Sequence, residues 1–237
     1  MKELKVSIVI PAHNEEKYLA DTLKAVCALD YKNFEVIVVN NASTDKTEEV
    51  AKNFPVKLAY EGKKGLLYAR ECGRKNATGE IIANMDADCL PEKDWIKKGV
   101  ESFKDKETVA VTGPYDYFDG SPFFRSFSLF IQKNIYSWAN KTMNTTKRGA
   151  ILIGGNNMIR ASVLNEIGGY NTDILFYGED TDTAKRVSKK GEVVFNKSFT
   201  MKTSARRFKA EGTFKISVLY LFHFLKVIFF SRTKSKK

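Results

Sequence analysis

Residues 6–15 read VSIVIPAHNE, and this stretch decides the fold class. Its first half is an apolar run of mostly β-branched side chains, which is typical of a strand buried on both faces of a parallel sheet. Pro11 ends the run, and Asn14 is a candidate N-cap for a helix whose first turn carries Glu15 and Glu16. The start of the chain is therefore predicted to form a strand, a polar loop and a helix.

The alternation of apolar runs and helical periodicity continues along the first half of the chain. The expected strands cover residues 6–10, 34–39, 56–60, 80–85 and 108–112, and helices lie between them, the clearest over 66–77 and 92–104. This alternation predicts an α/β fold with right-handed crossovers and a mostly parallel sheet that has helices on both faces. Ligands bind such sheets beyond the carboxyl ends of the strands, so the polar residues at those ends are candidate site residues.

The composition fits one globular domain with a short appendage. The chain has 237 residues, 43% of them hydrophobic and 28% charged, which is enough for a core without disulfide or metal staples. Its three cysteines are scattered and form no Cys-x-x-Cys pair, which excludes a disulfide scaffold and a cysteine zinc site. Residues 1–5 run directly into the first expected strand, so we expect no signal peptide.

The positive charge of the chain is concentrated at its C-terminus. The net charge is +11, and residues 202–237 contribute +9 of it through ten Lys or Arg and one acid, Glu211. A nucleic-acid groove spreads its charge over the folded surface, so we expect no nucleic-acid partner. The charges flank an apolar run over residues 216–230, which is shorter than the ~20 residues that span a bilayer. We expect residues 209–237 to lie in a membrane interface against anionic lipids, or alternatively to pack on the domain or a partner subunit.

Two acids follow the fourth expected strand directly, in the run Asp86-Ala87-Asp88. Carboxylates at positions i and i+2 repel each other unless a positive group lies beside them. A hard divalent cation with oxygen ligands meets this need, and Mg²⁺ commonly shares its coordination shell with substrate phosphates. The alternative is an acidic loop that caps the helix beginning near Pro91.

The ordered set of motifs resembles the family 2 glycosyltransferases, which have the GT-A fold. The resemblance covers residues 1–208, and the ordered set is more specific than any single motif. The matching runs are VSIVIPAHNEE at 6–16, VVNNASTD at 38–45, Gly65, Ala69-Arg70, Gly73, ATG at 77–79, Asp86-Ala87-Asp88, GGNN at 154–157, IGGY at 167–170 and GEDTD at 178–182.

The resemblance implies a nucleotide-diphospho-sugar donor held at the strand ends of the amino-terminal half. The residues that would line the nucleoside pocket are Pro11, Ala12, His13, Asn14 and Glu15. Arg70 would approach the base or the ribose. Asn40 stands where relatives commonly have an aspartate that reads the base, so the base is left open, and the alternative for Asn40 is a turn with a side-chain cap.

The same resemblance implies a divalent cation, Mg²⁺ or Mn²⁺, as cofactor. Asp88 is the expected main ligand, and Asp86 would lie nearer to the ribose or to the waters of the metal. Arg206 and Arg207 resemble the arginine-bearing segment of the family and would neutralise the departing diphosphate; the alternative is a basic membrane patch.

The resemblance also implies the chemistry of transfer. Asp180 would take the proton from the acceptor hydroxyl, with Glu179 as its partner in the acceptor site, and a single displacement would invert the anomeric carbon. The alternative is that both acids only stabilise the positive end of a helix over residues 180–190. Gly155 and Asn156 would let the backbone approach the sugar or acceptor, or would form an ordinary turn.

An aromatic-rich segment runs from Phe123 to Trp138. Phe123, Phe127, Phe130 and Ile131 fall on one helical face. An ordinary core helix explains this pattern, and the alternative is a contact with lipid or with a lipid-linked acceptor.

These observations predict a GT-A domain over residues 1–208, with a nucleotide-binding half over about 1–113 and an acceptor half over about 114–208, and a membrane-associating tail over 209–237. The predicted function is metal-dependent, inverting glycosyl transfer to a hydroxyl or lipid-linked acceptor in cell-envelope glycan biosynthesis. We expect the chain at the cytoplasmic face of the membrane, attached peripherally. A nucleotidyltransferase would carry a Gly-rich basic loop after its first strand, which residues 11–16 lack. The retained acids argue against a non-catalytic sugar-nucleotide-binding module.

Overall fold

The computed structural model describes residues 3–146, 149–174, 178–213, 215–216, 218–219 and 222. A seven-stranded sheet forms its centre, in the order β3-β2-β1-β4-β8-β6-β9. Its strands are β1 (Val6–Ala12), β2 (Phe34–Asn40), β3 (Lys57–Tyr60), β4 (Ile81–Met85), β6 (Thr108–Thr112), β8 (Asn156–Arg160) and β9 (Glu192–Phe195). Strand β8 runs antiparallel to both of its neighbours, and the other neighbouring pairs are parallel. The predicted α/β class with a mostly parallel sheet is confirmed.

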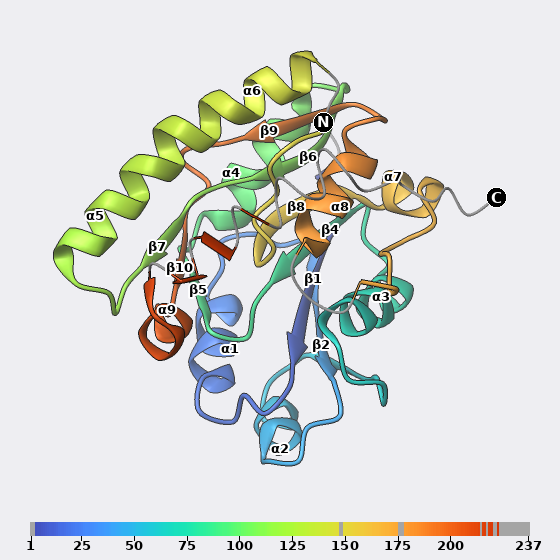
Figure 1. Cartoon of the computed structure of the whole chain (residues 1–237). Coiled ribbons are helices and arrows are strands. Elements are labelled where there is room, and N and C mark those ends of the chain that lie inside the picture. The colour runs from blue at the N-terminus through green and yellow to red at the C-terminus, as the bar shows by residue number, and fades with distance from the viewer. Residues whose placement is uncertain are drawn as a thin grey trace.

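Helices cover both faces of this sheet (Figure 1). Ile8 and Ile10 of β1 pack in one apolar cluster with α1, α2 and α4, whereas Val9 points to the other cluster with α3, α7 and α8. The central strands are therefore apolar on both sides, which is why their sequences are continuous apolar runs. The helices are α1 (Leu19–Cys27), α2 (Thr47–Lys52), α3 (Leu66–Asn76), α4 (Trp95–Glu101), α7 (Ala161–Glu166) and α8 (Glu179–Val187).

A second, smaller sheet closes over one end of the first. Its strands lie in the order β5 (Cys89–Pro91), β10 (Met201–Thr203) and β7 (Tyr115–Tyr117). Cys89 pairs with Thr203 across the β5–β10 ladder, and Thr203 pairs with Tyr117 across the β10–β7 ladder. This sheet carries the start of α9 (Arg206–Glu211) to the acidic loop that follows β4.

The predicted cap at Asn14 is wrong. Helix α1 begins at Leu19, after Tyr18, and no side chain caps it. Asn14 instead adopts a left-handed backbone (φ 56°), and its Oδ1 accepts a hydrogen bond from the backbone N of Thr44. Asparagine tolerates this conformation because its short amide bonds to nearby backbone, so here it joins two loops instead of starting a helix.

The aromatic-rich segment forms α5 (Pro122–Ile131), a π-helical turn over Gln132–Tyr136, and α6 (Ser137–Thr145). The interpretation as an ordinary core helix is wrong, because none of the residues of α5 is buried. Phe123, Phe127 and Phe130 expose more than half of their surface. The predicted shared face is present, but it points outward.

The start of the basic tail packs on the domain. Helix α9 crosses the boundary that we predicted at residue 208, Lys209 Nζ lies 3.1 Å from Asp119 Oδ2, and Ile216 is fully buried. The predicted tail is described only in part: residues 214, 217, 220, 221 and 223–237 lie outside the described residues. Among the described residues, no helix is both long enough and apolar enough to cross a membrane.

Candidate active site

The acidic loop lies at the carboxyl end of β4, beside the end of β1. These two strands are neighbours, and β2 lies on the far side of β1, so the strand order reverses between β1 and β4. Such a reversal opens a crevice in which α/β sheets bind ligands. The structure therefore brings residues 11–15 and Asp86-Ala87-Asp88 to one edge, as the sequence predicts.

Arg70 of α3 joins two acids that are far apart in the sequence. Its Nη1 donates to Asp180 Oδ1 at 2.8 Å, and its Nη2 lies 3.6 Å from Asp86 Oδ1. The Arg70 side chain is 3% exposed, and its Nε has no partner among the described residues. These contacts make Arg70 the buried counter-charge of the two carboxylates. Its role at the base or ribose stays a prediction.

Asp88 lies against Arg206 at the start of α9. Arg206 Nε is 2.9 Å from Asp88 Oδ2, and the same guanidinium donates two hydrogen bonds to the carboxylate of Glu15. The Arg206 guanidinium also stacks over the ring of Tyr18, 4.5 Å from its centroid. Burial raises the pKa of Asp88 to about 6, the charge of Asp86 adds to this, and Arg206 opposes it. Arg206 thus contacts two acids of the candidate site, and its role at the departing diphosphate stays a prediction.

The acidic loop has the donor set of a hard divalent cation. Ligand atoms of Asp86, Asp88 and Cys89 all lie within 4.8 Å of one another. Burial raises the pKa of the Cys89 thiol well above its usual value, so the thiol stays protonated and is a poor ligand. The two carboxylates suit Mg²⁺ or Mn²⁺, which complete their shells with water and phosphate oxygens. The residues present fit the predicted cofactor.

Glu179 and Asp180 open helix α8 after Gly178, whose backbone is left-handed (φ 90°). Glu179 is buried, with Oε2 unpartnered among the described residues, whereas the Asp180 side chain is 32% exposed. Burial raises the pKa of both carboxyls; the charge of Asp180 adds to the rise at Glu179, and Arg70 opposes it at Asp180. Asp180 is therefore the member of the pair that both reaches solvent and has a cation that favours its ionised form.

Gly154 and Gly155 pass directly over the acids. A Cβ on Gly155 would collide with Asp86 Oδ2 and the hydroxyl of Tyr115, and a Cβ on Gly154 would collide with the carboxylate of Asp180. The loop thus approaches the side chains of the candidate site closely, and its approach to a sugar or acceptor stays a prediction. Only glycine leaves enough room at these two positions.

Asn156 lies in the core. It is fully buried, its Oδ1 accepts from Trp95 Nε1 at 2.9 Å, and its Nδ2 donates to the carbonyl of Phe199 at 2.8 Å. All of this places the amide away from solvent, so the acceptor role predicted for Asn156 has no support in the geometry. Its bonds hold β8 to the segment that leads into β10.

The loops expected to hold the nucleoside are locked to each other. His13 Nδ1 lies 2.7 Å from the carbonyl oxygen of Asn41, and the backbone N of Asn14 donates to Ser43 Oγ. Asn40 is 3% exposed; its Nδ2 donates to Glu48 Oε2, and its Oδ1 accepts from the backbone N of Ser43. The Asn40 amide therefore serves the turn, which is the alternative that the sequence left open.

Tyr115 is a site residue that the sequence analysis missed. Its hydroxyl donates to Asp86 Oδ2 at 3.0 Å, and burial raises the pKa of Tyr115 well above its usual value, so it stays a donor. The available signal was its position just beyond the expected strand over 108–112. Arg207 pairs with Glu211 at 3.2 Å, and its charge lowers the pKa of Glu179; its predicted role at the diphosphate stays a prediction.

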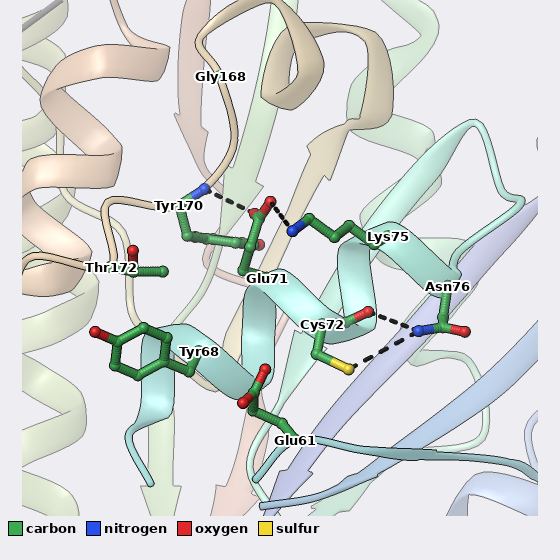
Figure 2. Close-up of a pocket in the computed structure, with 9 residues that line it drawn as sticks. All are labelled: Glu61, Tyr68, Glu71, Cys72, Lys75, Asn76, Gly168, Tyr170 and Thr172. Atoms are coloured by element: carbon green, nitrogen blue, oxygen red, sulfur yellow. Dashed lines mark hydrogen bonds and ion pairs between the residues drawn. The ribbon is translucent and has the colours of Figure 1, made fainter. Parts of the chain in front are cut away.

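A separate pocket of about 400 Å³ lies between α3 and the segment Gly168–Thr172 (Figure 2). Figure 2 shows Glu71 at its wall, accepting from the backbone N of Tyr170 and lying near Lys75 Nζ. None of the predicted site residues lines this pocket. It is therefore distinct from the candidate active site.

The sequence matches the family model described as "Glycosyl transferase family 2" over residues 7–168. The chain belongs to this family. A probable glycosyltransferase of Bacillus subtilis, YdaM, is 32% identical over 201 residues, which cover 79% of this chain and 47% of YdaM. The chain thus spans about half the length of that relative.

Solved structures share the fold of this family member. A mannosyltransferase from Pyrobaculum calidifontis, solved with GDP-Man and Mn²⁺, has a TM-score of 0.76 at 22% identity and covers 99% of this chain and 67% of its own. TarS of S. aureus, residues 1–349 with UDP-GlcNAc, has a TM-score of 0.63 at 19% identity and covers 85% of this chain and 58% of its own. These likenesses confirm the GT-A-type fold.

Proposed function

We propose that this chain transfers a sugar from a nucleotide-diphospho-sugar donor to an acceptor hydroxyl, with a divalent cation and with inversion of the anomeric carbon. One observation carries the proposal: Arg70 joins the acidic loop after β4 to Asp180 at the start of α8, so a metal-type site and a candidate base share one crevice. The family supports the reaction class. The complexes of two structural neighbours with GDP-Man and UDP-GlcNAc support the donor class.

Asp86 and Asp88 would hold the cation. When bound, Mg²⁺ or Mn²⁺ supplies a Lewis acid that neutralises the leaving diphosphate. Arg206, with Nε 2.9 Å from Asp88 Oδ2, would add a second positive charge where the diphosphate departs. Tyr115 donates to Asp86 and fixes its orientation, while Gly155 allows the loop to pass over it.

Asp180 would act as the general base. Its ionised form is favoured by the 2.8 Å contact with Arg70, and about a third of its side chain faces solvent, where an acceptor can reach it. An acceptor hydroxyl that donates to Asp180 becomes a better nucleophile as the sugar–phosphate bond breaks. Because the acceptor oxygen attacks directly from the side opposite the phosphate, one displacement inverts the anomeric centre. Glu179 would hold the acceptor beside the base.

We further propose a glycan or lipid-linked acceptor at the cytoplasmic face of the membrane, with peripheral attachment through the basic tail. The charge balance of residues 202–237, +9 of the total +11, supports this placement. Each Lys or Arg near an anionic leaflet contributes about 1 kcal/mol to the free energy of membrane binding. The chain would then contribute to cell-envelope glycan synthesis.

A thermal-shift screen against UDP-, GDP- and dTDP-sugars with Mn²⁺ tests the donor, because a bound donor stabilises the fold by mass action. Asp88→Asn should abolish the Mn²⁺-dependent part of that shift and sugar transfer, while the circular dichroism spectrum stays unchanged. Asp21→Asn is the matched control, since Asp21 is an exposed acid on α1. A full metal-dependent shift in Asp88→Asn, or transfer in excess chelator, would contradict the proposal.

A further inference from the structure

Four aromatic side chains of α5 and α6 are exposed. Phe123, Phe127 and Phe130 of α5 are 78%, 54% and 60% exposed, and Trp138 of α6 is 70% exposed. Spacings of four and three residues place the three phenylalanines on one face of α5. We call these four side chains the aromatic ridge. Figure 1 shows α5 and α6 as one rod along an outer edge of the molecule.

The face of this rod that contacts the domain combines polar groups with the ring of Phe124, which packs on Tyr117 and Phe208. Gln132 exchanges hydrogen bonds with the backbone N and O of Tyr115, and Arg125 forms an ion pair with Asp116 of β7. Asn140 donates to the carbonyl of Val193 on the edge strand β9. A helix that only covers a sheet turns its apolar face inward and its polar face to water. Here polar side chains contribute much of the inner contact, and the rings of Phe123, Phe127, Phe130 and Trp138 are exposed.

The rod is also free of acids. Between Asp119 and Glu166 the sequence contains no Asp or Glu. The basic residues in that interval are Arg125, Lys133, Lys141, Lys147, Arg148 and Arg160. Among the described residues, neither Lys133 nor Lys141 forms an ion pair with an acid.

We propose that the aromatic ridge is a membrane-contact surface that rests on an anionic lipid bilayer. Aromatic rings favour the boundary between headgroups and acyl chains, and lysines beside them favour lipid phosphates. Charge complementarity selects this occupant. A second copy packed ridge to ridge would bring two acid-free, basic surfaces together, and the C-terminal tail carries the same positive sign. An anionic bilayer supplies the opposite charge.

The contact lies close to the candidate active site. Gln132 on the inner side of the rod bonds to the backbone of Tyr115, whose hydroxyl bonds to Asp86. A bilayer under the ridge would therefore be separated from the acidic loop by the rod and β7. The membrane contact itself does not depend on glycosyl transfer; only the benefit for a lipid-linked acceptor rests on the function proposed above.

The two tryptophans of the chain allow a direct test. Trp95 is fully buried and stacks on Phe199, whereas Trp138 belongs to the ridge. Full-length protein mixed with phosphatidylcholine–phosphatidylglycerol vesicles should show a blue shift of tryptophan emission and quenching by brominated lipid. Both signals should disappear in Trp138→Phe, which keeps an aromatic ring on the ridge. Lipid-dependent quenching that persists in Trp138→Phe, or its absence in the parent chain, would overturn the proposal.

A second arm measures binding. Phe123→Ser/Phe127→Ser in the full chain should lower partition into the same vesicles by about tenfold or more, because the buried apolar area sets the strength of interfacial binding. Tyr60→Ser is the control, since Tyr60 is 67% exposed and lies on β3, outside the ridge. Equal partition of the double variant and the parent would overturn the proposal, as would a dimer in light scattering that the double variant abolishes. Mn²⁺-dependent nucleotide binding should be unchanged in the double variant, so failure of the ridge and failure of the proposed function are distinguishable.

Discussion

Arg206 Nε lies 2.9 Å from Asp88 Oδ2, so the carboxylate expected to bind the metal is already paired with a cation of the chain. The second oxygen of Asp88 lies 3.4 Å from the hydroxyl of Thr203. A metal ion that approaches Asp88 must therefore compete with Arg206. Once displaced, the guanidinium lies next to the position where a metal-bound diphosphate would leave.

Arg206→Gln should strengthen Mn²⁺ binding in the absence of donor. The variant removes a competing cation, and a partly exposed ion pair of this kind is worth about 1 kcal/mol, which corresponds to about fivefold in affinity. Titration of the nucleotide-free protein with Mn²⁺, followed by electron paramagnetic resonance, measures the effect directly. Sugar transfer should fall in the same variant, because a positive charge beside the leaving group is lost.

Arg207→Gln provides the control for this experiment. Arg207 is adjacent in sequence but pairs with Glu211 and not with Asp88. Its Mn²⁺ affinity should match that of the parent chain. Weaker Mn²⁺ binding in Arg206→Gln would show that the guanidinium supports the metal site instead of competing for it.

Local patterns were sufficient to predict five strands of the central sheet, β1, β2, β3, β4 and β6, but not β8 or β9. Val6–Ala12 and Thr108–Thr112 are continuous apolar runs because both of their faces are buried, and such runs are visible without tertiary information. The motif at residues 178–182 likewise located the start of α8 to within one residue. In these segments the local pattern and the structure agree, whereas at Asn14 a contact with the loop at Thr44 replaced the predicted helix cap.

Contacts between distant segments could not be predicted in this way. Nothing near Arg70 in the sequence indicates that its guanidinium joins Asp86 to Asp180, and nothing near Tyr115 points to Asp86. These contacts arise because the second sheet and α8 fold back over the acidic loop. The outward face of α5 was missed for a related reason: periodicity identifies an apolar face but not what covers it.

Asp180→Asn should separate catalysis from donor binding. The amide keeps the shape of the carboxylate and accepts a bond from Arg70, but it cannot take a proton from the acceptor. Transfer should fall by roughly 10²-fold or more, the usual scale for loss of a general base, while the affinity for donor and Mn²⁺ stays within about twofold. The assay compares single-turnover transfer with calorimetric donor binding. A variant that loses donor affinity in proportion to activity would assign Asp180 to binding.

Arg70→Gln should move the acid limb of the pH–rate profile to higher pH. The charge of Arg70 and its hydrogen bond both lower the pKa of Asp180. Removing them raises that pKa, so the base is protonated over a wider range and the rate is lost at a higher pH as the solution is acidified. A shift of about one pH unit is expected, the lower end of the range for a neighbouring charge. Arg70→Lys keeps a positive charge, so its acid limb should shift less than that of Arg70→Gln. If the two variants have the same acid limb, the assignment is contradicted.

Gly155→Ala should damage the site through a single methyl group. The added Cβ would overlap Asp86 Oδ2 and the Tyr115 hydroxyl, so these two side chains must shift. Overpacking of this kind costs about 1–3 kcal/mol of unfolding free energy, and Mn²⁺ binding should weaken with it. Gly62→Ala is the control, because its Cβ would meet only the ring of Tyr60, at 3.5 Å. Equal thermal stability and equal Mn²⁺ affinity in the two variants would contradict the expected collision.

The positive charges of the last four basic residues of the tail should contribute to membrane binding. A full-length variant with glutamine at four basic positions should float less well with anionic vesicles, by at least about tenfold at low salt, because each cation near the leaflet contributes about 1 kcal/mol. The four positions are Arg232, Lys234, Lys236 and Lys237. The loss should shrink in high salt, since charges more than ~10 Å apart are screened at 0.1 M ionic strength.

The control for the tail variant removes the same charge from the folded body. Its four lysines lie on the surface in ion pairs with acids of the chain: Lys24, Lys52, Lys97 and Lys104. Vesicle flotation of this control should match the parent, because paired lysines elsewhere on the surface offer little net charge to lipid. Equal losses in the two variants would mean that net charge alone drives binding. Unchanged flotation of the tail variant would mean that the tail packs on protein and that the membrane contact lies elsewhere.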